Sequence, residues 1–290
     1  MRTTAATRGW RAAALALLCL SGRASADPPE NPSETDRQFK LACVAFLEAK
    51  APNNPAAAAA AAFYRAHPAA DVRPVTTEEM NQYYGTSNIP WDRVGGMVDS
   101  KSKIVFMLEH PSIGIVLRDP SGRLAPQPNL DAALARIGAR LVHETSHLMV
   151  WEDMHEPLTG IVQNELLAHA REARYLERDQ VTTPVGDNDG NWMTQVALLA
   201  AYRSGPSALG KFVRDIYGPE SGYWSVYADP RRPASGIAAR LADPKMPRGY
   251  RDYLSVQRDF WNDGARVSAA RSYFDSTLPE YKDLNWPGEQ

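Results

Sequence analysis

The chain has 290 residues, of which 44% are hydrophobic and 23% are charged, and its formal net charge is −2. A chain of this size can bury a sizeable core without disulfide bonds. The slightly acidic balance excludes the basic surface that nucleic-acid binding requires, so no nucleic-acid partner is expected.

The N-terminus predicts a Sec-type signal peptide over residues 1–26. An arginine-rich start precedes an apolar run at 12–20, and an Ala-Ser-Ala cleavage pattern follows at 24–26. The run is too short for a membrane span. We therefore expect export to the periplasm or beyond, with Asp27 as the mature N-terminus. The segment carries four arginines and no acid, so its removal leaves a net charge of −6.

Residues 27–36 are polar and proline-rich, which predicts a linker. A single domain is expected over 37–290. Helical patterns occur at 35–50, which overlaps the end of the linker, and at 55–65 and 77–84. Thr76 is a possible N-cap of the last of these. Cys43 lies among apolar residues of the first helix, so we interpret it as a core residue.

Two short apolar runs, at 103–108 and 113–117, are rich in β-branched residues and predict strands. They complete an N-terminal part, 37–130, of helices and strands. The prediction is an α+β, predominantly helical fold with a small β-sheet ahead of the next helix. A strand that lines a cleft could pair with an extended substrate backbone.

The next helix carries a stripe of apolar residues at helical spacing, with Asn129 or Asp131 as N-cap. The stripe consists of Leu134, Ile137, Leu141 and Leu148. His143 and His147 lie off its centre, so they could face a cleft.

These two histidines belong to an H-E-x-x-H motif, His143-Glu144-Thr145-Ser146-His147. Positions i and i+4 share one helix face, so both imidazoles can reach one metal ion. Neutral imidazole is a good zinc ligand. Glu144 borders the same face, where a carboxylate can accept a proton from a water. The motif predicts hydrolysis at a single zinc ion per chain.

A third ligand is expected, because catalytic zinc usually has three protein ligands. The segment 159–179 predicts a second amphipathic helix, which would return against the first and present Glu165 to the histidines. Asp153 and His155 are rival third ligands. Asp153 has the spacing of the metzincin arrangement, but Val150 occupies the position of the glycine at which that chain turns.

The segment 131–178 resembles the gluzincin metallopeptidases of the zincin fold. In that family the H-E-x-x-H helix is followed by a helix whose glutamate, often preceded by asparagine, is the third ligand; here these residues are Asn164-Glu165. The resemblance implies that His143, His147 and Glu165 bind Zn²⁺ and that Glu144 is the general base.

One position departs from that family. Many gluzincins carry an aspartate four residues after the ligand glutamate, where it orients a zinc-bound histidine; here the residue is His169. A carboxylate partner fixes the tautomer and the angle of a bound imidazole. His169 cannot supply the charge, whereas Glu172 lies near the same helix face and could do so.

The C-terminal part, 179–290, shows helical patterns at 191–204, 207–217 and 250–273. Its aromatic cluster either packs in the core or lines the cleft, where one phenol could stabilise an oxyanion. The cluster consists of Tyr217, Tyr223, Trp224 and Tyr227.

These observations predict an exported zinc-dependent hydrolase, a metallopeptidase acting on peptides or proteins. One alternative is a zinc hydrolase of cell-wall peptides. Another is a zinc-binding structural or interaction protein without turnover, against which the presence of Glu144 argues, because a structural site needs no base. The sequence makes no prediction about oligomeric state.

Overall fold

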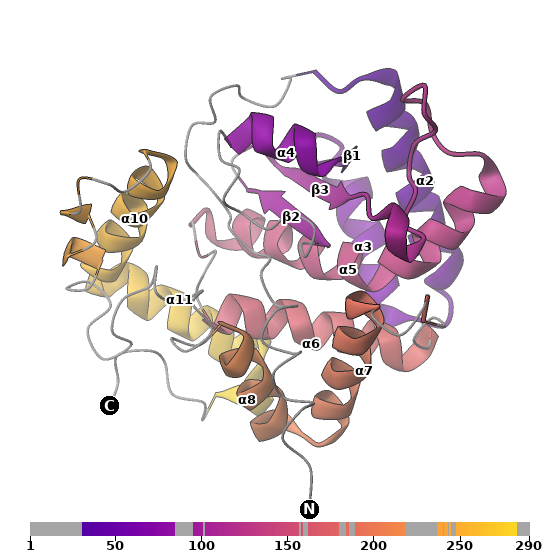
Figure 1. The fold of residues 1–290 in the computed structure, drawn as a ribbon. Coiled ribbons are helices and arrows are strands. Elements are labelled where there is room, and N and C mark those ends of the chain that lie inside the picture. The colour runs from indigo at the N-terminus through magenta and orange to yellow at the C-terminus, as the bar shows by residue number, and fades with distance from the viewer. Residues whose placement is uncertain are drawn as a thin grey trace, which may run out of the picture.

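A computed structural model gives the fold (Figure 1). It describes residues 31–84, 95–100, 102–156, 158, 162–179, 184–185, 189–217, 237–239, 241–242, 244 and 248–282. The predicted signal peptide lies outside these residues, as do Tyr223, Trp224 and Tyr227 of the aromatic cluster.

The described residues form an α+β fold that is mostly helical, as predicted. The elements are α2 (Glu34–Lys50), α3 (Pro55–Ala66), β1 (Asp71–Val75), α4 (Thr77–Tyr84), β2 (Gly96–Asp99), β3 (Ile104–Leu108), the 3-10 turn η2 (Pro111–Ile113), α5 (Gln127–Met154), α6 (Val162–Asp179), α7 (Gly190–Arg203), α8 (Pro206–Tyr217), α10 (Arg248–Trp261), α11 (Gly264–Thr277) and the 3-10 turn η4 (Pro279–Tyr281). No helix among them is both long enough and apolar enough to cross a bilayer.

Side-chain caps set several of these helix boundaries. Ser33 caps α2 in a reciprocal pair with Asp36, so the helix begins inside the predicted linker. The Thr76 hydroxyl accepts a bond from the Glu79 amide at 3.2 Å, which confirms the predicted cap of α4. The helical pattern predicted at 250–273 corresponds to two helices: Asp263 caps a new helix, so α10 and α11 are separate.

The sheet has the order β1-β3-β2, with β1 parallel and β2 antiparallel to β3. The strand predicted at 103–108 is confirmed as β3. The strand predicted at 113–117 is wrong: a 3-10 turn ends there at Gly114, whose φ is 76°, and Ile115 makes only an isolated bridge to His110. A left-handed residue of this kind interrupts a strand and favours glycine.

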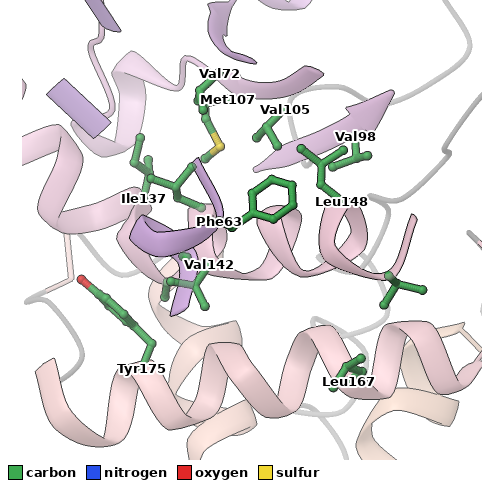
Figure 2. Close-up of a cluster of buried hydrophobic side chains, with 14 of the residues drawn as sticks. Phe63, Val72, Val98, Val105, Met107, Ile137, Val142, Leu148, Leu167 and Tyr175 are labelled. Atoms are coloured by element: carbon green, nitrogen blue, oxygen red, sulfur yellow. The ribbon is translucent and has the colours of Figure 1, made fainter. Parts of the chain in front are cut away.

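Helix α5 separates the sheet from α6, and α7 and α8 pack on α6 (Figure 1). Side chains from the sheet, α3 and both central helices fill the core between these layers (Figure 2). Gly138 permits the close packing of α5: a Cβ there would lie 2.6 Å from the Tyr175 hydroxyl oxygen. The predicted N-caps of α5 are wrong, because the helix begins at Gln127 and has no side-chain cap.

Candidate metal centre

Six ionisable side chains gather where α5 and α6 pack together, and each is at most 2% exposed. Three come from α5 (His143, Glu144, His147) and three come from α6 (Glu165, His169, Glu172). On each helix, residues three, four or seven apart share a face, so every α6 member of the set points to one side. A packed helix pair therefore brings both halves of the set together.

Three ligand atoms form a small triangle at the centre of this set. The Nε2 atoms of His143 and His147 lie 3.3 Å apart. The Glu165 Oε2 atom lies 3.7 Å from the first of these nitrogens and 3.8 Å from the second. The structure thus brings the predicted third ligand to the two histidines. Two other buried groups that share His143 could also hold a metal ion: one adds Glu144 and His147, the other adds His169 and Glu172.

Glu172 organises the opposite side of the His143 ring. Its Oε2 atom lies 3.0 Å from the Nδ1 atom of His143 and 3.0 Å from the Nδ1 atom of His169. A carboxylate can only accept, so each Nδ1 carries the hydrogen, and the Nε2 atom of His143 is left with its lone pair toward the triangle. Glu172 thus has the geometry of the orienting carboxylate that His169 cannot supply.

Arg140 lies one helical turn before His143 and places its Nη2 atom 3.8 Å from Glu172 Oε1. Burial opposes the charge on Glu172, but Arg140 and the two imidazole hydrogen bonds outweigh it and hold the pKa of Glu172 well below its usual value. At the imidazoles burial prevails: although Glu172 raises the pKa of His143 and Asn164 raises that of His147, burial lowers the first well below its usual value and the second to about 3. Both histidines are therefore neutral at pH 7, the form that binds metal.

Several buried side chains among the described residues have one polar atom without a hydrogen-bond partner, but Glu144 has two. Both of its carboxylate oxygens are buried without a hydrogen-bond partner among the described residues. Burial raises the pKa of Glu144 well above its usual value, and the charges of Glu165 and Glu172 raise it further against the effect of Arg140. An unsatisfied buried carboxylate is costly, so such a group indicates a function beyond stability.

Strand β2 passes directly over this carboxylate. A Cβ added to Gly96 would lie 2.9 Å from Glu144 Cγ and 3.1 Å from Glu144 Oε1, and one added to Gly95 would lie 3.3 Å from Arg140 Nε. Glycine is needed here because the strand backbone approaches the side chain so closely. The sheet therefore borders the centre at Gly96.

The rival third ligands lie away from the triangle. Helix α5 continues without a turn at Val150, so Asp153 is about 9 Å farther along the axis than His147. Asp153 is exposed and accepts a hydrogen bond from the Tyr273 hydroxyl at 2.7 Å. His155 ends the helix in a left-handed conformation with φ 53° and is also exposed.

Two members of this centre, Arg140 and Gly96, were not predicted from the sequence. Arg140 had a usable signal, since position i−3 from His143 shares its helix face. Gly96 had only the Gly95-Gly96 pair as a signal, because its role depends on how the sheet packs against α5.

Comparison of the chain with protein-family models, with curated proteins and with solved structures finds no match in any of the three. The function is therefore inferred from the residues and their geometry.

Proposed function

We propose that this protein is a zinc-dependent hydrolase of peptide bonds, similar in its site to the gluzincins, with His143, His147 and Glu165 holding one zinc ion. The triangle of ligand atoms supports this most directly. Zinc–ligand bonds of about 2.0–2.1 Å at tetrahedral angles place neighbouring ligand atoms about 3.3 Å apart. The triangle edges of 3.3, 3.7 and 3.8 Å need only a small contraction to meet that geometry.

Zinc, when bound, would polarise the scissile carbonyl and make a water acidic enough to attack at neutral pH. Glu144 would accept the proton of the attacking water and then donate it to the leaving amine. Its unpartnered oxygens leave it free for this transfer, and its raised pKa suits a group that must both take and give a proton near pH 7. A carboxylate fixed in a closed hydrogen-bond network could not do so.

The edge position of β2 in the described sheet offers a place for the substrate. An extended peptide can add to the free edge of a sheet through its backbone. Gly96 lies on this edge beside Glu144, so a scissile bond aligned there would lie near the proposed base. This arrangement supports a peptide as the substrate class.

The test is the Glu144→Gln variant. We expect kcat on casein to fall by about 10²–10⁴-fold, because general-base catalysis contributes on that order, while zinc content stays at one ion per chain. Glu48→Gln, on the exposed surface where Glu48 pairs with Arg65, is the matched control and should retain activity. Retained activity in Glu144→Gln would rule out Glu144 as the general base.

The same pair of variants separates the alternatives. The activity of both variants is also measured on purified cell wall in place of casein. Cleavage of the wall alone, abolished in the Glu144→Gln variant, would identify a hydrolase of cell-wall peptides. Stoichiometric zinc without turnover on either substrate would favour the non-catalytic protein.

A further inference from the structure

A second pocket lies on the far side of α6 from the metal centre. It has a volume of about 330 Å³ and is formed by α3, α5, α6 and the end of α7. Arg171, Arg174 and Arg178 line it, and they lie between about 120° and 180° around the helix from Glu165. The two sites therefore use opposite faces of the same helix.

Arg171 is the unusual residue in this pocket. Its side chain is partly buried, its one hydrogen bond to a described residue is to the Met149 sulfur at 3.1 Å, and no carboxylate lies within ion-pairing distance among the described residues. Thioether sulfur is a weak acceptor. Burial lowers the pKa of Arg171, with Asp153 and Tyr273 acting against it. A guanidinium that is partly removed from water gains from a charged acceptor, and among the described residues this one has only the sulfur.

The neighbouring polar groups also favour the binding of an anion. Arg178 is exposed and has no hydrogen bond or ion pair with a described residue. Arg174 is held by Glu280 at 2.7 Å and donates to the Tyr202 hydroxyl, whose own proton remains available to a ligand. Glu177 is the one acid in the lining, and its nearest cation is Arg203 at 3.6 Å. The pocket is thus net positive.

The remaining wall is mostly apolar. It consists of Pro55, Ala56, Ala59, Ala60, Val142 and Met149, small or flexible side chains that leave room beside the arginines, and of Ser146, whose hydroxyl donates to the Val142 carbonyl. Ligand sites commonly combine such a wall with a few placed polar groups, and their volumes begin at about 300 Å³.

We propose that this pocket binds a small organic anion, a carboxylate that carries a short apolar chain, with the carboxylate on Arg171 and the chain against α3. The carboxylate supplies the acceptor that Arg171 lacks, and the alanine face of α3 takes the apolar part. The site is independent of zinc and of catalysis.

Octanoate is a suitable probe, with octanol and acetate as controls for its two parts. By calorimetry we expect octanoate to bind the full protein with a dissociation constant of about 1 mM or lower, and each control to bind at least about tenfold more weakly. Added zinc should leave the octanoate affinity unchanged, which separates the pocket from carboxylate binding at the metal centre. Equal affinity for octanoate and octanol would overturn the anion site, and equal affinity for octanoate and acetate would overturn the apolar part.

Two variants place the binding. Arg171→Gln should weaken octanoate by about tenfold or more, since a charge-assisted hydrogen bond is lost, whereas Arg123→Gln removes the same charge from an exposed residue and should have no effect. Ala59→Phe should block the pocket by filling it from the surface of α3. Unchanged octanoate affinity in both Arg171→Gln and Ala59→Phe would refute the proposal.

A stability measurement shows whether the variants at Arg171 still fold. Arg171→Met should melt at about the temperature of the parent protein or above it, because it replaces a partly buried charge without a carboxylate partner among the described residues by an apolar chain. A large fall in melting temperature would show that Arg171 is structural and would count against the pocket.

Discussion

Two clusters of charged side chains in this protein differ in how completely they are satisfied. In the first, the Arg118 guanidinium bonds both oxygens of Glu79, at 2.9 and 2.6 Å, and Glu109 Oε2 at 2.9 and 3.1 Å. The other oxygen of Glu109 accepts the backbone amides of Leu117 and Arg118. In the metal centre, by contrast, the Glu144 oxygens have no hydrogen-bond partner among the described residues, and two imidazole nitrogens face each other across 3.3 Å.

The difference separates structure from function. When every donor in a buried cluster has an acceptor, the hydrogen bonds offset the free-energy cost of desolvation and the cluster stabilises the local fold. A cluster with unmatched acceptors is stable only because the rest of the fold holds it, or because a ligand completes it. We therefore expect substitutions in the Arg118 cluster to change stability alone, and substitutions in the metal centre to change metal binding.

The largest effect should come from Glu165→Ala. It removes one of the three proposed ligands, and we expect zinc affinity to fall by about a thousandfold, equivalent to about 4 kcal/mol. Competition with a zinc chelator measures this affinity. Glu177→Ala, on the opposite face of α6, is the control and should bind zinc as the parent does. Equal affinity in Glu165→Ala and in the control would place the third ligand elsewhere.

Arg118→Met should have the next largest effect, on stability. Removal of the cation leaves Glu109 and Glu79 without their shared partner, and we expect the free energy of unfolding to drop by about 3 kcal/mol. Urea unfolding measures the change, and zinc content should remain one ion per chain. A loss of zinc binding in the folded variant would contradict the separation of the two clusters.

Glu172→Gln should lower zinc affinity, but by less than Glu165→Ala does. The amide still fits the space but cannot accept both imidazole N–H groups as a charged carboxylate does, so the orientation of His143 is weakened. Partners of this kind typically contribute 10–100-fold to metal affinity, so we expect a loss of about tenfold or more. The His169→Gln variant serves as a comparison, because His169 contacts Glu172 and its loss should have a smaller effect. A larger loss in His169→Gln than in Glu172→Gln would reverse these roles.

Local patterns predicted the helices of this centre because each is determined by short-range spacing. His143 and His147 are one turn apart on α5, and Glu165 was placed by the resemblance of the second helix. The interaction of Glu172 with both imidazoles could be suggested but not fixed, since it depends on how closely α5 and α6 pack, which Gly138 permits.

The sheet was predicted poorly for a different reason. Strand β1 contains Arg73 and Pro74, and its buried Arg73 is neutralised by Asp71 at 2.7 Å, so the apolar alternation that marks a strand is missing. Strand β2 has only four residues. Both strands exist because β3 pairs with them, and tertiary pairing of this kind leaves little trace in a local pattern.

The smallest effect concerns the pH dependence of the satisfied cluster. Burial raises the pKa of Glu79, but hydrogen bonds from Arg118 and the Thr76 amide outweigh it and lower the pKa below 4.5. A folded-state pKa below the unfolded value means that the carboxylate stabilises the fold above about pH 4.5 and that this contribution is lost as the pH falls through the folded value. Glu79→Gln should therefore cost about 1 kcal/mol at pH 7, a modest figure because a third of the side chain is exposed.

That cost should shrink as the pH falls through the lowered pKa of the folded state, because the parent carboxylate is itself protonated there. Urea unfolding of both proteins at pH 7 and pH 3.5 measures the change, and zinc binding at pH 7 should be the same in both. A difference between the two proteins that stays constant with pH would mean that the ion pair with Arg118 contributes nothing. The contrast between the two clusters would then rest on hydrogen-bond geometry alone.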